Sequence, residues 1–128
     1  MANLSALNPS ERDAHFLRRS FEVARRARTR GNHPFGAILV DASRKVLIEA
    51  ENGYMPARDR TAHAERLLAT QACTTLDPGT LRSATLYSSA EPCAMCAGAI
   101  YWAGIGRCQV WQRVQCCTMS RFWRRPAQ

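Results

Sequence analysis

Lysine is nearly absent from this sequence, and it contains no long hydrophobic run, internal repeat or low-complexity tract. The longest uncharged stretch, residues 93–106, is shorter than the roughly 18 apolar residues of a membrane span, so we expect no membrane association. Residues 1–13 lack a basic start followed by an apolar block, so we expect no secretory signal and a cytoplasmic protein. The composition also excludes a disordered chain, a collagen-like repeat and a coiled coil.

What remains is typical of one globular domain. The chain has 128 residues, of which 46% are hydrophobic and 22% charged. Folding at this length buries about two-thirds of the unfolded surface, which is enough for a core without disulfides. We expect one domain at residues 1–112, followed by an atypical basic tail at residues 113–128.

Positive charge exceeds negative charge. Eighteen Lys and Arg residues against ten Asp and Glu residues give a net charge of +8. The excess is uneven, because residues 107–128 contain five Arg and no acidic residue. A basic surface attracts phosphates, so one interpretation is a nucleic-acid substrate. The alternative is a set of solvated helix faces.

Hydrophobic spacing predicts alternating helices and strands. Helices are expected from Ser10, as the capping residue, to Gly31, from Thr61 or Ala62 to Ala72, and from Pro92 to Gly104. Strands are expected at residues 35–40, 46–50, 84–88 and 108–111, and Asp77-Pro78-Gly79 is expected to end the second helical region. This order predicts an α/β fold, a three-layer α/β/α sandwich around a central mixed sheet whose last two strands are parallel.

Three potential metal ligands stand at two predicted helix starts. Cys93 and Cys96 are three residues apart, so one helical turn places both sulfur atoms on the same face. A helix N-terminus favours thiolate, and imidazole and thiolate are both zinc ligands. With His63, they would hold one Zn²⁺ per chain and leave a fourth position for water, which is typical of a catalytic site.

Two other interpretations of these cysteines stay open. A structural zinc would be closed by Cys73, Cys108 or a cysteine of the tail, where Cys116 and Cys117 lie. A redox Cys-x-x-Cys motif is the other alternative, although nothing else in the chain indicates a thioredoxin-like unit.

Glu65 adds a carboxylate two residues after His63. Both side chains can border one opening when they lie in the first turn of a helix. A carboxylate beside a zinc-activated water can take up its proton and return it to the substrate. The alternative is an exposed glutamate that is favoured only by the helix dipole.

The combination His63-x-Glu65 and Pro92-Cys93-x-x-Cys96 resembles the cytidine and deoxycytidylate deaminase superfamily of zinc deaminases. The resemblance extends from about His33 to Val110. It implies zinc held by His63, Cys93 and Cys96, and a proton shuttle at Glu65. In this family, a zinc-activated water replaces an exocyclic amine of the base, which leaves as ammonia.

Within the superfamily, the sequence is similar to guanine deaminases, which convert guanine to xanthine, and next to the tRNA adenosine deaminases. Tyr101-Trp102 and Pro34-Phe35-Gly36-Ala37 carry the likeness to the guanine branch. The resemblance implies a purine base contacted by Phe35, Asn52, Ala64 and Trp102. Asn52 would hydrogen-bond the base, Phe35 would stack on it and Trp102 would line a closed slot. The alternatives are core aromatics at Phe35 and Trp102 and a turn at Asn52.

The tail departs from both branches, which usually continue with a further strand and helices. Three functions therefore follow as hypotheses: a purine base deaminase, a tRNA or other nucleic-acid deaminase, and a zinc-binding relative with lost activity. A homodimer is also implied by the resemblance. The pair Phe122 and Trp123 would be buried on the partner.

Overall fold

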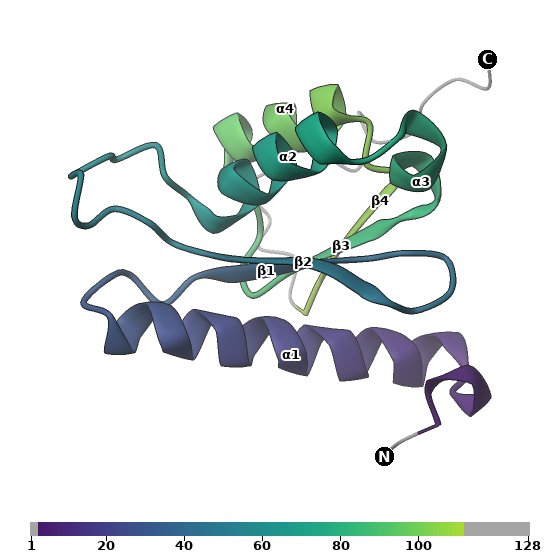
Figure 1. Cartoon of the computed structure of the whole chain (residues 1–128). Helices are drawn as coiled ribbons and strands as arrows, with labels where there is room; N and C mark the ends of the chain where they lie inside the picture. Colours follow the sequence, from purple (N-terminus) through teal and green to yellow (C-terminus); the bar gives the residue numbers. More distant parts are fainter. Residues whose placement is uncertain (1–2, 112–128) are drawn as a thin grey trace.

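The computed structural model describes residues 3–111, which form a four-stranded sheet between two layers of helices (Figure 1). The strands are β1 (Gly36–Val40), β2 (Val46–Glu51), β3 (Thr85–Ser88) and β4 (Arg107–Val110), in the spatial order β2-β1-β3-β4. Strand β1 is antiparallel to both β2 and β3, whereas β3 and β4 are parallel. The predicted mixed sheet and its parallel last pair are therefore confirmed.

The helices divide between the two faces of the sheet. Helix α1 (Pro9–Thr29) covers one face, and α2 (Ala64–Thr75) and α4 (Ala94–Ala103) lie side by side on the other. The one-turn helix η1 (Leu4–Ala6) precedes α1, and α3 (Pro78–Ser83) follows α2. One core cluster contains Phe16 and Tyr87 on the α1 side, and a second contains Leu68 and Ile100 on the α2 side. The predicted three-layer sandwich is confirmed.

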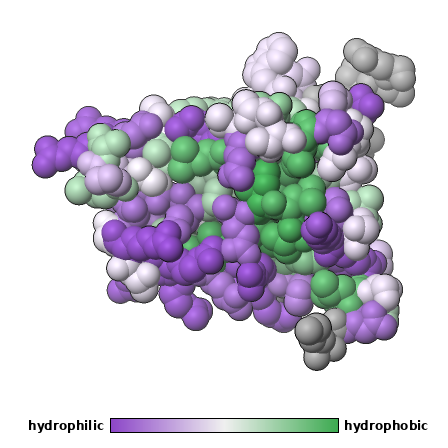
Figure 2. All heavy atoms as spheres, viewed as in Figure 1, coloured by the Kyte–Doolittle hydropathy of each residue, from purple (hydrophilic) through white to green (hydrophobic). Residues whose placement is uncertain are grey.

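Hydrophobic atoms also reach the surface, and Figure 2 shows them gathered between helix α2 and the edge strand β2. Leu47, Ala50 and Leu76 are partly buried side chains that pack against the core cluster shared by α2 and β2. Within residues 3–111, no helix has both the length and the apolar character needed to cross a membrane.

Helix α1 begins earlier than predicted, because Asn8 and not Ser10 is its N-cap. Oδ1 of Asn8 accepts a hydrogen bond of 2.9 Å from the N–H of Glu11, and Oε2 of Glu11 accepts one of 3.0 Å from the N–H of Asn8. This reciprocal pair satisfies two backbone donors at the helix start, and Pro9 suits the position that follows the cap.

The prediction that Asp77-Pro78-Gly79 ends a helical region was incomplete, because these residues begin α3. Asp77 is the N-cap, and its carboxylate accepts a hydrogen bond of 3.0 Å from the N–H of Thr80. Proline at the first helical position then favours the helix, since no intrahelical N–H bond is lost there. The same three residues therefore serve as a stop for one helix and a start for the next.

Helix α2 starts two or three residues later than predicted and α4 two residues later, so that His63 and Cys93 are their N-cap residues. Helix α4 ends at the predicted glycine, Gly104, whose φ of 86° is the left-handed conformation that glycine adopts without strain.

Gly36 has a different role, because strand β1 runs very close to α1. A Cβ atom at Gly36 would lie 2.5 Å from the backbone nitrogen of Ala24.

Candidate metal centre and substrate pocket

The start of β1 and the ends of β2 and β3 meet at one end of the strands. Because β1 is antiparallel to both of its neighbours, Gly36 pairs with Glu51 and Ala37 pairs with Ser88. The start of β1 therefore lies beside the ends of β2 and β3. The N–H of Asn52, directly after β2, donates a hydrogen bond of 3.0 Å to the carbonyl of Phe35, directly before β1.

The three predicted metal ligands come together at the N-termini of α2 and α4. His63 caps α2, Cys93 caps α4, and Cys96 lies in the first turn of α4. Nδ1 of His63 lies 3.6 Å from Sγ of Cys93 and 3.5 Å from Sγ of Cys96. All three donor atoms lie within 4.8 Å of one another.

This donor set fits a tetrahedral zinc ion. With zinc–sulfur bonds of about 2.3 Å and zinc–nitrogen bonds of about 2.0–2.1 Å, a sulfur and a nitrogen at two corners lie about 3.6 Å apart. The observed separations of 3.5 and 3.6 Å match that value. Within residues 3–111 the ligand group consists of these three residues, so neither Cys73 nor Cys108 is a fourth ligand. The tail cysteines Cys116 and Cys117 lie outside the described residues.

The protein environment by itself disfavours a free thiolate at Cys96. Burial raises the pKa of its thiol, and the neighbouring Glu65 carboxylate and Cys93 raise it further. All of these effects oppose the thiolate that the helix N-terminus was expected to favour. A cation would reverse the balance, because binding of a metal by cysteine releases the thiol proton.

Glu65 is the second residue of α2 and only 5% exposed. Its Oε1 accepts a hydrogen bond of 2.7 Å from Oγ of Ser88, at the end of β3. The alternative of an exposed glutamate at a helix start is therefore wrong, because this carboxylate is buried and has a side-chain partner. Its influence on the Cys96 thiol shows that it lies close to the ligand group.

A cavity of about 390 Å³ opens next to His63. Its wall also contains Asn52, predicted to bind substrate, and four residues without a predicted role, namely His33, Tyr54, Asp59 and Arg60. Three of the four belong to residues 53–61, the segment between Asn52 and His63, for which the sequence predicts no site residue. A segment that joins Asn52 to His63 must pass the site, and this connectivity was the available signal.

The orientation of Asn52 follows from its hydrogen bonds. This side chain is buried, and its Oδ1 accepts a hydrogen bond of 3.0 Å from the N–H of Tyr54. An amide oxygen, not the amide nitrogen, must face that N–H. The NH₂ group of Asn52 is therefore the polar group left for another partner, and it can only donate.

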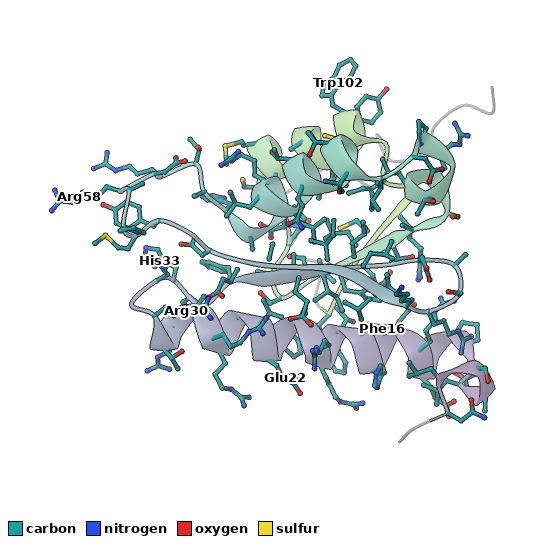
Figure 3. The ribbon with its side chains drawn as sticks, viewed as in Figure 1. Phe16, Glu22, Arg30, His33, Arg58 and Trp102 are labelled. Carbon is teal, nitrogen blue, oxygen red and sulfur yellow. The ribbon has the colours of Figure 1, made fainter. Side chains whose placement is uncertain are left out.

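The other predicted substrate contacts do not form a closed slot in the described chain. Phe35 is 42% exposed, and its backbone carbonyl accepts the hydrogen bond from Asn52. Ala64 is fully buried as the first residue of α2. Trp102 is 84% exposed near the end of α4 and projects away from the sheet (Figure 3), so it is not part of the cavity wall. Of the expected slot, the cavity wall in the described residues contains Asn52, and the substrate contacts of Phe35, Ala64 and Trp102 stay predictions.

The fold and this ligand group together define a zinc-type α/β domain with its site at two helix N-termini. Residues 10–112 match the family model described as "Cytidine and deoxycytidylate deaminase zinc-binding region". This match covers most of the chain, and the protein therefore belongs to the cytidine and deoxycytidylate deaminase family.

Curated relatives with different names share this similarity. A "Probable cytosine deaminase" of Schizosaccharomyces pombe is 45% identical over 105 residues, which are 81% of this chain and 62% of the relative. A "tRNA-specific adenosine deaminase" of Haemophilus influenzae is 39% identical over 98 residues, 77% of this chain and 57% of the relative. The chain thus spans about 60% of the length of these relatives.

The guanine deaminase of Bacillus subtilis is similar in both sequence and structure. It is 40% identical over 89 residues, 69% of this chain and 56% of the relative. Its X-ray structure superimposes with a TM-score of 0.66 and 34% identity, covering 81% of this chain and 64% of that chain. This likeness confirms the predicted cytidine deaminase-like fold.

Proposed function

We propose that the protein is a zinc-dependent hydrolytic deaminase of a purine nucleobase, most simply guanine, which it would convert to xanthine and ammonia. The observation that carries the proposal is the joint placement of His63 and Asn52 in one cavity wall. A base held by Asn52 would have its ring next to the ligand group.

The chain's own residues divide the work of this reaction. His63, Cys93 and Cys96 would hold one zinc ion, which supplies the Lewis acidity that makes a water nucleophilic near neutral pH. Glu65 would take the proton of the attacking water and deliver it to a ring nitrogen of the base. It would then move the remaining proton of the added hydroxyl to the exocyclic amine, so that the carbon–nitrogen bond breaks, ammonia leaves and the carbonyl forms.

Two features support a free base. The NH₂ group of Asn52 suits a hydrogen-bond acceptor on the base, such as a carbonyl oxygen or a ring nitrogen. In addition, part of the basic surface of α1 is already neutralised, since Arg19 and Arg26 lie 2.7 and 2.5 Å from carboxylate oxygens of Glu49. This face therefore offers RNA fewer unpaired cations than its number of arginines suggests.

A second candidate substrate is an adenosine in tRNA, and the cavity wall itself favours it. Arg60 lies in that wall, and the loop that contains Arg58 extends from the same end of the molecule (Figure 3). Arginine side chains near a base pocket suit the phosphates that flank a nucleotide. A third candidate, a zinc-binding relative without activity, is motivated by the tail, which lies outside the described residues.

One assay separates these candidates. The zinc-loaded protein is incubated with guanine, cytosine, adenosine and an anticodon stem-loop at about 0.15 M salt, where non-specific RNA binding is weakened. Ammonia release and the product base are measured. Xanthine from guanine is the expected result. Inosine from the stem-loop, or uracil from cytosine, would replace the proposed substrate, and no product from any of them would favour the inactive relative.

We also propose that the protein is a homodimer. Helix α4 contains no charged residue, and its Met95, Tyr101 and Trp102 are exposed although they are large and apolar. A helix that is apolar on all sides is typical of a buried position. Light scattering at micromolar concentration should give the mass of two chains, and Trp102→Glu should lower it toward one. A wild-type monomer would refute the dimer.

A further inference from the structure

Ser88, the last residue of β3, lies fully buried beside the candidate site. Its Oγ is 2.7 Å from Oε1 of Glu65 and 2.6 Å from the carbonyl oxygen of Ala90. We propose that Ser88 is a positioning residue that holds the carboxyl group of Glu65 and ties it to the segment that carries Cys93. The catalytic part of this inference rests on the function proposed above, whereas the contact itself does not.

The two contacts of Ser88 join segments that are distant in the sequence. Glu65 belongs to the first turn of α2, and Ala90 lies in the connection from β3 to α4. That connection delivers Cys93 to the N-cap of α4, where its sulfur lies 3.6 Å from Nδ1 of His63. A movement of Glu65 relative to the cysteine segment would therefore break one of the two contacts of the Ser88 hydroxyl.

The chemistry of a hydroxyl explains how this bridge orients Glu65. A serine Oγ has one proton and can accept two further hydrogen bonds. The Ala90 carbonyl only accepts, so it and Oε1 of Glu65 share the Ser88 hydroxyl between them. Oε1 is thereby held against the end of β3. Rotation of the carboxyl group away from Ser88 would break this contact and leave the buried hydroxyl with one partner fewer.

The competing explanation is that Ser88 only fills space in the core. A buried hydroxyl elsewhere in the protein provides the matched control. Ser20 is also fully buried, and its Oγ donates a hydrogen bond of 2.6 Å to the Leu17 carbonyl within α1, on the opposite side of the sheet from α2. Ser20→Ala removes a comparable hydroxyl without touching the candidate site.

The first test measures kinetics with the substrate that the wild type uses best in the panel. Ser88→Ala should retain its zinc and keep KM within about twofold, while kcat falls about 10- to 100-fold, as is typical of groups that orient a metal site or its base. Ser88→Thr, which restores the hydroxyl, should recover most of kcat, and Ser20→Ala should leave it unchanged. An unchanged kcat in Ser88→Ala, or an equal loss in Ser20→Ala, would overturn the proposal.

The second test needs no activity and no metal. Thermal unfolding of the zinc-free protein is compared for the wild type, Ser88→Ala, Glu65→Ala and the double variant. Ser88→Ala should lower Tm by at least about 3 °C in the wild type and by clearly less when Glu65 is absent, because coupled residues are not additive. Equal losses in both backgrounds would show that Ser88 does not hold Glu65. If the wild type releases no ammonia, the proposed function is wrong. The unfolding measurement still shows whether Ser88 holds Glu65.

Discussion

The hydroxyl group of Tyr87 donates a hydrogen bond of 2.7 Å to Oδ1 of Asp13, which joins strand β3 to helix α1. Arg107 of β4 donates to the same carboxylate, with distances of 3.1 and 2.6 Å to its two oxygens. One carboxylate thus connects the helical layer on one face to both parallel strands. The segment that follows β3 carries the candidate metal ligand Cys93. The network therefore fixes the strand that precedes this ligand.

Stability should depend on pH through Asp13. Burial alone would raise the pKa of this carboxyl group, but hydrogen bonds from Arg107, Tyr87 and Arg12 outweigh burial and lower the pKa from 3.8 to about 2. Since the folded-state pKa lies below the unfolded one, the contribution is present above about pH 4 and is lost as the pH falls through the folded-state value. A shift of this size corresponds to about 2 kcal/mol.

Urea unfolding of the wild type and Asp13→Asn checks this prediction. The stability advantage of the wild type should be about 2 kcal/mol larger at about pH 6 than at about pH 2. Glu22→Gln, which removes an exposed carboxylate from the same helix, should show little such change. An advantage over Asp13→Asn that stays constant across this range would contradict the depressed pKa.

Zinc content should depend on Cys96 and not on cysteine in general. Cys96→Ala removes a donor atom that lies 3.5 Å from Nδ1 of His63, so most of the bound zinc and part of the folding stability should be lost. Cys73→Ala is the matched control, because this cysteine is exposed on α2 and lies outside the ligand group. Metal analysis after gel filtration measures both variants. Full zinc content in Cys96→Ala would exclude the ligand assignment.

Replacement of the Glu65 carboxylate should separate metal binding from hydrolysis. Glu65→Gln preserves size and an oxygen that can accept from Ser88, so the fold and zinc content should persist. The amide cannot shuttle protons, and the rate of ammonia release should fall by about 10² to 10⁴. Wild-type turnover in a correctly folded, zinc-loaded Glu65→Gln protein would exclude Glu65 as the proton shuttle.

The sequence predicts the metal group better than it predicts the pocket, for a physical reason. His63, Cys93 and Cys96 lie at helix starts, and a three-residue spacing or a strand–helix connection places such residues by local rules. Arg60 and Tyr54 lie in a loop whose course depends on tertiary packing, which local spacing does not encode. The alternative of a core aromatic at Trp102 was wrong, because this side chain is 84% exposed, and a hydrophobic residue on an apolar helix indicates burial without indicating what covers it.

Two glycines should respond oppositely to a single methyl group. In Gly36→Ala the new Cβ would lie 2.5 Å from the nitrogen of Ala24, between strand β1 and helix α1, and the backbone must shift. We expect a loss of about 1–3 kcal/mol, as for other overpacked cores. Gly98 lies inside α4 with no atom within 4 Å of such a Cβ, so Gly98→Ala should gain about 0.5–1 kcal/mol from helix propensity. Chemical unfolding of both variants provides the comparison.

Asn52 offers a test of substrate binding that keeps the pocket wall intact. Its Oδ1 fixes the loop by accepting from the N–H of Tyr54, whereas its NH₂ group is free to donate to a base. Asn52→Asp keeps the accepting oxygen and removes the donor, and Asn52→Ala removes both. If the NH₂ group binds the base, Asn52→Asp should therefore lose most of the affinity that Asn52→Ala loses, while keeping more of its stability.

A lost hydrogen bond that leaves a buried polar group facing a negative charge costs about 1.5–3 kcal/mol, so KM of Asn52→Asp should rise about 10- to 100-fold. Zinc content should not change, because Asn52 is not in the ligand group. Tyr54→Phe controls for the loop, since the Tyr54 contact to Asn52 is made by the backbone and survives the substitution. KM for the preferred base, measured by ammonia release, decides the matter. If Asn52→Asp binds as well as the wild type, Asn52 serves the loop alone, and recognition of the base falls to the remaining pocket residues.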